Sequence, residues 1–328
     1  MKKQNRIINT LLNPKAILGI IISVGGLYWA FKDFQFQEFK NSLNQVKYFY
    51  VFVAMFFLWL SVWFRAFRWE YLFKLDSKPS TNSLYKAEMM GYFGNNVLPV
   101  RLGELLRSYL IGNEWKLSTS YVFGTVVLER LLDTLSLAAF AFLLILIYPL
   151  EESLRYSILC YSGIFIVAIM TILMILHKAK SIETNNKILS SLKQIMDGLL
   201  SINKGSILPV IVLSMIIWSI YFLDVYLIQY AFKFNLFFDE ILMILVLSSL
   251  ALSIPSAPGM IGTYHAAVIY AVVTILGKNQ IEGEAFAIIM HAYGYILFTV
   301  LGAYYFMKNQ FHKHAVRTVM DIDVSRDD

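Results

Sequence analysis

The chain has 328 residues, of which 58% are hydrophobic and 15% are charged, and its formal net charge is +6. One soluble core cannot bury this much apolar surface, so the composition excludes a soluble globular protein and indicates a polytopic membrane protein. The basic residues lie beside hydrophobic segments, which argues against nucleic acid as a partner. The single cysteine, Cys160, excludes an internal disulfide and a paired-cysteine metal site.

Six apolar runs have about the length that a membrane-spanning helix needs. They cover residues 17–31, 48–67, 121–148, 157–176, 207–232 and 285–307. The first run follows two lysines, as in a signal sequence, but Trp29 and Phe31 stand where a cleavage site needs small residues. We therefore expect an uncleaved first helix.

Two further apolar regions, 84–112 and 240–277, are interrupted near their middles. The breaks fall at Pro99 and Gly103 in the first region, and at Pro255, Pro258, Gly259 and Gly262 in the second. Each region predicts a hairpin of two short helices, because proline and glycine end helices. The predicted fold is therefore an all-α membrane protein with six spans and two broken-helix hairpins. If the second region crosses fully, the number of spans is eight.

The distribution of lysine and arginine predicts the orientation. The N-terminal segment and residues 65–86, 178–204 and 308–328 carry eighteen of them, whereas the loops 32–47, 151–155, 233–240 and 278–284 carry six. The excess of positive charge places both termini in the cytoplasm, with the protein integral to the inner membrane. With this topology the two hairpins enter from opposite sides. Their shared spacing, Pro99-x-x-x-Gly103 and Pro258-x-x-x-Gly262, fits an inverted repeat whose broken helices meet near the midplane around a substrate.

Residues 1–328 are expected to form a single transmembrane domain without a soluble synthase domain, and residues 310–328 a short cytoplasmic tail. The polar stretch 178–205 carries apolar residues at helical spacing. It predicts a cytoplasmic amphipathic helix on anionic lipid. The alternative is a plain connector between spans.

The first break brings charge into an apolar region. Arg101 and Arg107 suit an anionic headgroup, because a guanidinium matches phosphate or carboxylate oxygens and stays charged when desolvated. Glu104 lies one helical turn from each, so a neutralised Arg-Glu-Arg cluster is the structural alternative. Asn95 and Asn96 add neutral donors and acceptors beside the break.

A second charged cluster, Glu129, Arg130 and Asp133, lies inside the apolar run 121–148. These residues pair with one another or with the arginines of the hairpin. In either case the cluster is a structural network or a transport relay.

Six residues give weaker signals. Asp224, His265 and His291 are candidates for proton exchange, with a packing role as the alternative for the histidines. Arg65, Arg68 and Trp69 end the second span and indicate interfacial anchors.

Common catalytic motifs are missing from the sequence. It contains no His-Glu-x-x-His, no paired cysteines, no Gly-x-Ser-x-Gly and no Gly-Lys-Ser/Thr phosphate loop. We therefore expect neither a metal nor a cofactor, and a transporter rather than an enzyme.

At these residues the chain resembles the membrane domain of the lysylphosphatidylglycerol synthase/flippase family. The resemblance is carried by the two breaks, by the Glu129-Arg130-Asp133 cluster and by Arg68-Trp69. It implies a flippase-like protein that moves a phospholipid between leaflets, with Asn95, Asn96, Arg101, Glu104, Arg107, Glu129, Arg130, Asp133 and His265 at the headgroup. Many members have a glutamate near the position of His265. The histidine lessens negative charge there and leaves room for a more anionic lipid.

The leading hypothesis is therefore a lipid translocase whose partner is an anionic or zwitterionic membrane lipid. One alternative is an enzyme acting on a lipid-linked phosphate, with Glu104 or Glu129 as general base. Another is a membrane partner of a separate soluble synthase or glycosyltransferase, which docks through the polar stretch 178–205.

Overall fold

The computed structural model describes residues 21, 24–29, 31–32, 34–74, 78–98, 102–149, 152, 156, 160, 187–252 and 257–324, with side chains up to Asn309. All regular elements in this part of the chain are helical, as predicted. The helices are α3 (Phe36–Asn44), α4 (Tyr48–Glu70), α5 (Thr81–Val97), α6 (Gly103–Glu114), α7 (Thr119–Ile147), α9 (Lys187–Leu199), α10 (Ile207–Ala231), α11 (Phe238–Ala251), α12 (Thr263–Ile269) and α13 (Gln280–Val324). Short 3₁₀ turns, η2 (Lys204–Ser206) and η3 (Pro258–Met260), and a π-helical segment, η4 (Tyr270–Ile275), complete the set.

Five described helical segments are long and apolar enough to cross a membrane. They are Tyr48–Glu70, Thr119–Ile147, Lys204–Ala231, Pro258–Ile275 and Gln280–Asn309. Four of them coincide with the predicted runs 48–67, 121–148, 207–232 and 285–307, and the remaining one is the second half of the interrupted region 240–277. The predicted span 157–176 lies outside the described residues except for Cys160, and much of the span 17–31 does too. The protein is an all-helical polytopic membrane protein.

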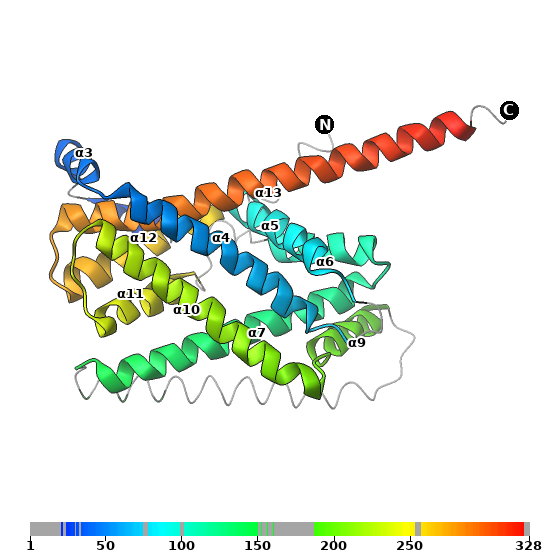
Figure 1. The fold of residues 1–328 in the computed structure, drawn as a ribbon, viewed down its shortest axis with the longest axis horizontal. Coiled ribbons are helices and arrows are strands. Elements are labelled where there is room, and N and C mark those ends of the chain that lie inside the picture. The colour runs from blue at the N-terminus through cyan, green and yellow to red at the C-terminus, as the bar shows by residue number, and fades with distance from the viewer. Residues whose placement is uncertain are drawn as a thin grey trace.

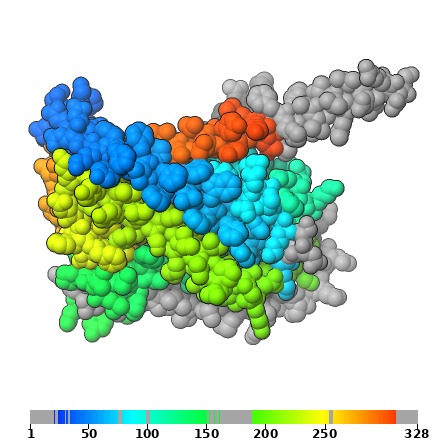
Figure 2. Space-filling view, viewed as in Figure 1, coloured from blue at the N-terminus to red at the C-terminus, as the bar shows by residue number. Residues whose placement is uncertain are grey.

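The helix α4 packs against α10, α5, α13 and α7. In Figure 1, α13 follows one side of the molecule and projects beyond it, while α7 follows the opposite side. Figure 2 shows α4 running across the viewed face from α3 toward α5, and Phe67 near its C-terminal end is exposed. The other face of this end, which carries Arg65, Arg68 and Trp69, is buried against the neighbouring helices.

The first interrupted region forms the predicted hairpin. The helix α5 starts at an N-cap, where the Ser80 hydroxyl accepts a hydrogen bond from the Ser83 amide. The Ser83 hydroxyl in turn bonds Glu114 across 2.6 Å, which joins the start of α5 to the end of α6. Near the break the two backbones touch, because a Cβ atom on Gly103 would lie 1.9 Å from the Gly91 carbonyl oxygen. Pro99 and Arg101 lie outside the described residues.

The second interrupted region also folds back on itself. Lys278, after η4, donates to the Phe234 carbonyl before α11 across 3.1 Å, so the open ends of this hairpin are joined too. At the break, Gly259 has φ 70° and Gly262 has φ 100°, and glycine adopts both at little cost. Pro255 lies outside the described residues.

The two breaks lie together in the molecule, because α5 contacts η3. Asn96, near the end of α5, also donates to the Thr299 hydroxyl of α13 across 2.9 Å. This contact agrees with the expected meeting of broken helices. The opposed insertion directions and the inverted repeat stay predictions.

The predicted amphipathic helix within 178–205 is present as α9, and it packs against α7. Gly124 of α7 and Gly198 of α9 allow this close approach, since a Cβ atom on Gly198 would lie 2.0 Å from the Tyr121 carbonyl oxygen. Met196 and Leu199 are buried, whereas Leu192 is exposed. One apolar edge of α9 is thus covered by protein, and contact of the other edge with lipid stays a prediction.

Candidate functional site

Four arginines and four carboxylates from four helices form one ion-pair network inside the bundle. Arg65 and Arg68 come from α4, Glu88 from α5, Glu104 and Arg107 from α6, and Glu129, Arg130 and Asp133 from α7. With every group ionised the charges balance. Such a balance is what charges at membrane depth require.

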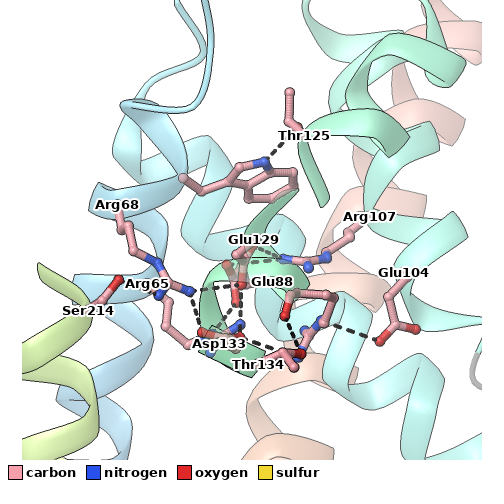
Figure 3. Close-up of polar contacts among 12 residues, drawn as sticks. Arg65, Arg68, Glu88, Glu104, Arg107, Thr125, Glu129, Asp133, Thr134 and Ser214 are labelled. Atoms are coloured by element: carbon pink, nitrogen blue, oxygen red, sulfur yellow. Dashed lines mark hydrogen bonds and ion pairs between the residues drawn. The ribbon is translucent and has the colours of Figure 1, made fainter. Parts of the chain in front are cut away.

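Glu129 is the centre of this network and is completely buried. Figure 3 shows Arg65 and Arg107 approaching it from opposite sides. Arg65 makes a short ion pair with one carboxylate oxygen, and Arg107 Nη1 lies 2.9 Å from the other. The prediction that the cluster on α7 reaches an arginine of the hairpin is therefore confirmed for Arg107.

Arg65 and Arg68 hold α4 to α7. Arg65 Nη2 lies 3.0 Å and Arg68 Nη2 lies 2.6 Å from the carboxylate oxygens of Asp133. Arg68 Nη1 also donates to the Ser214 hydroxyl of α10 across 2.9 Å. The interpretation of Arg65, Arg68 and Trp69 as interfacial anchors is wrong, because these side chains are at most 3% exposed and face the interior.

Glu88 of α5 was not predicted as a site residue. It is 1% exposed and lies 3.1 Å from Arg107 Nη1 and 3.4 Å from Arg65 Nε. Arg107 also stacks over the Trp69 ring, with 4.7 Å between the guanidinium carbon and the ring centroid. Arg107 is thus enclosed by two acids and an indole.

Arg130 differs from the other three arginines. Its side chain is 42% exposed, and its contacts are long, with Nε 3.9 Å from Glu104 and Nη1 3.7 Å from Asp133. It lies eleven residues after the start of α7, about 16 Å along the helix and close to the middle of a bilayer. Its side chain is therefore partly exposed at that depth, whereas Nε is buried and has no hydrogen-bond partner among the described residues.

The tip of the first hairpin lies beside Arg130. Asn95 accepts a hydrogen bond from the Gly103 amide across 2.9 Å and donates to Glu104 across 3.2 Å. The side chain of Glu104, which is 23% exposed, thus bonds Asn95 and faces Arg130, and Arg107 pairs with Glu88 and Glu129 instead. The Arg-Glu-Arg alternative predicts that Glu104 pairs with both Arg101 and Arg107. Its Glu104–Arg107 pair, which lies within the described residues, is not formed.

His265 belongs to a different part of the bundle. It is buried, accepts a hydrogen bond from the Gly262 amide at Nδ1 across 3.4 Å, and lies edge-on to His291 with 4.8 Å between ring centroids. Within the described residues, no ion pair or hydrogen bond connects it to the network. The structure therefore separates the predicted site residues into the network beside the first break and the histidines at the second.

A cavity of about 480 Å³ opens at the base of the first hairpin, between α5, α6 and α13. Its lining includes Lys86, Glu114 and Lys308. No group of three or more potential metal ligands occurs among the described residues.

The fold and the site together define the class of protein. It is an all-helical membrane bundle with a charge-balanced ion-pair network beside a broken hairpin. The chain belongs to the family of the lysylphosphatidylglycerol synthase transmembrane region, whose model matches residues 16–302. It is 29% identical to the UPF0104 membrane protein MJ1078 of Methanocaldococcus jannaschii over 60% of this chain and 85% of that protein. It is 29% identical to the UPF0104 membrane protein MJ1595 of the same organism, over 37% of this chain and 38% of that protein. No solved structure matches.

Proposed function

We propose that this protein moves a phosphate-bearing lipid between the two leaflets, with the headgroup held by Arg130 at the tip of the first hairpin. The partly exposed and incompletely paired side chain of Arg130 carries this proposal. It lies near mid-membrane depth, its side chain is 42% exposed, and its two ion-pair distances leave it incompletely paired. A charged group in that position has a desolvation cost that ligand binding offsets.

The chemistry of the tip suits a phosphate. A guanidinium offers a planar set of donors to phosphate oxygens. Arg101 stays a predicted headgroup ligand, by its place in the sequence between α5 and α6. Glu104 beside Arg130 favours a headgroup that also carries a donor, such as a hydroxyl or an amine.

The family supports a lipid as substrate, because its model describes the membrane region of enzymes that make a phospholipid. In this proposal the three buried arginines have a structural role. Arg65, Arg68 and Arg107 hold α4, α5, α6 and α7 together by ion pairs, so that the tip keeps its position while the headgroup passes.

The test is transport in reconstituted liposomes. Candidate lipids with labelled headgroups, including phosphatidylglycerol, phosphatidylethanolamine and a polyprenyl phosphate, are placed in one leaflet, and their appearance in the other is timed. We expect Arg130→Gln to slow the transported lipid about tenfold or more, because one charge-assisted contact is lost. Lys40→Gln on the exposed helix α3 is the control, since it removes the same charge away from the network. Equal rates for wild type, Arg130→Gln and empty liposomes with every lipid would refute the proposal.

A further inference from the structure

Asp224 of α10 is a buried carboxyl group that the ion-pair network does not include. It is 3% exposed, and neither carboxyl oxygen has a hydrogen-bond partner among the described residues. An ionised carboxylate without a partner is strongly disfavoured in a low-dielectric interior. The surroundings of Asp224 therefore suit the neutral carboxylic acid, in which a proton occupies the group.

The groups that face Asp224 are phenols. Tyr264 of α12 and Tyr293 of α13 interact with it electrostatically, and Ser248 of α11 contacts the Tyr264 hydroxyl. No positively charged group among the described residues acts on Asp224 electrostatically. Asp224 thus has two phenols near it, but no fixed positive charge that would hold it ionised.

Three aromatic rings, which begin with that of Tyr264, lead from Asp224 to the second break. The ring of Tyr264 stacks on His291 with 4.9 Å between centroids, and His291 lies 4.8 Å from His265. His265 bonds the Gly262 amide, and His291 contacts the Gly259 backbone. Both glycines have positive φ, so this break is a place where the backbone can change conformation.

Asp224 also lies near one end of its helix. Seven residues separate it from the end of α10 at Ala231, which is about 10 Å along the helix axis. The loop that follows, 233–240, is on the side that the charge distribution predicts to be external. Asp224 is therefore nearer to this end of α10 than to the other.

We propose that Asp224 is a proton-binding site, and that its loss and uptake of a proton couples a transmembrane proton gradient to movement at the second break. The acid O–H bond breaks, the proton passes to water on one side, and the carboxylate accepts hydrogen bonds from Tyr264 and Tyr293. A proton from water on the other side then restores the acid. This coupling rests on the proposed lipid transport, whereas proton binding by Asp224 does not.

Proton binding is tested on the purified protein by infrared spectroscopy. We expect a carboxylic acid C=O band that Asp224→Asn lacks. The matched control is Glu284→Gln, since Glu284 is also buried but accepts a hydrogen bond from Gln280 across 2.8 Å. This control should retain the Asp224 band. A wild-type spectrum in which no acid band depends on Asp224 would overturn the site.

Coupling is tested in liposomes with and without a pH gradient. The gradient should accelerate lipid transfer several-fold for wild type, Glu284→Gln and Asp224→Glu, and should have no effect on Asp224→Asn. Asp224→Glu keeps the carboxyl group and so separates its chemistry from folding. Wild-type transfer that ignores the gradient, or an Asp224→Asn protein that still responds, would overturn the coupling. An Asp224-dependent response to a sodium gradient at equal pH would overturn the proton as the ion. If the wild type moves no lipid at all, the proposed function fails, and the infrared band still decides whether Asp224 binds a proton.

Discussion

At the scale of single residues, burial divides the network arginines into two kinds. Arg65, Arg68 and Arg107 are at most 3% exposed, and each lies within 3.1 Å of at least one carboxylate. Arg130 is 42% exposed and lies no closer than 3.7 Å to an acid. Removal of a buried partner leaves an uncompensated charge, whereas a half-exposed pair contributes little to stability. The two kinds should therefore respond differently to substitution.

Arg65→Gln should lower the free energy of unfolding by about 3–5 kcal/mol, since it leaves Glu88 and Glu129 short of one positive charge in the interior. Arg130→Gln should lower it by at most about 1 kcal/mol. Thermal unfolding of the two variants in the same detergent measures the difference. Equal losses would contradict the division of roles between the buried and the accessible arginines.

Sequence reasoning found part of this site. It identified Glu129, Arg130 and Asp133 and their link to Arg107, because charges inside an apolar run need partners. It placed Arg65 and Arg68 at the membrane surface, because basic and aromatic residues at the end of an apolar run are also the pattern of an interfacial belt. Only the packing of α4 against its neighbours shows that this end is enclosed.

Glu88 was missed because nothing in its local pattern marks it. A count of charges would have pointed to a missing acid. Five arginines, Arg65, Arg68, Arg101, Arg107 and Arg130, stand against the three recognised acids Glu104, Glu129 and Asp133. This excess of positive charge calls for further acids, and Glu88 lies in the same apolar region as the first break.

At the scale of elements, the glycine contact between α5 and α6 decides whether the first hairpin can close. Gly103→Ala should destabilise the protein by about 1–3 kcal/mol, because its Cβ would lie 1.9 Å from the Gly91 carbonyl oxygen and 2.5 Å from Asn95 Oδ1. Gly205→Ala is the matched control, as nothing lies within 4 Å of a Cβ atom there. Unfolding temperatures in detergent test this, and an unchanged Gly103→Ala protein would show that the two helices need not touch.

The helices themselves were largely predictable, because each apolar run must become a helix to satisfy its backbone in lipid. Most ends differ by a few residues where polar residues continue the helix, but α13 continues to Val324, well beyond the predicted end at residue 307. The predicted run 48–67 is extended to Glu70 and so includes Arg68, whose charge is paired inside, and the hairpin predicted from residue 84 starts at Thr81 after the Ser80 cap. The π-helical segment η4 has no counterpart in the pattern of apolar residues.

At the scale of the whole molecule, the two hairpins form one unit. Each has its open ends joined by a hydrogen bond, Ser83 to Glu114 in the first and Lys278 to the Phe234 carbonyl in the second. Their breaks lie together through α5 and η3. The partly exposed side chain of Arg130 on α7 lies beside the first break, and the second break is connected through histidines and Tyr264 to Asp224. A lipid site and a proton site on contacting hairpins provide a physical route for coupling.

The direction of that coupling depends on which side of the membrane each loop occupies. The charge distribution predicts that residues 178–204 are cytoplasmic and that 233–240 are external. In a Cys160→Ser background, Gly205→Cys places a single thiol at an exposed position beside the first loop, and Asp239→Cys places one at a partly exposed position within the second. An impermeant thiol reagent should label Asp239→Cys in intact cells and Gly205→Cys only after the membrane is opened. The reverse pattern would contradict cytoplasmic termini, and it would place the end of α10 that is nearer to Asp224 on the cytoplasmic side.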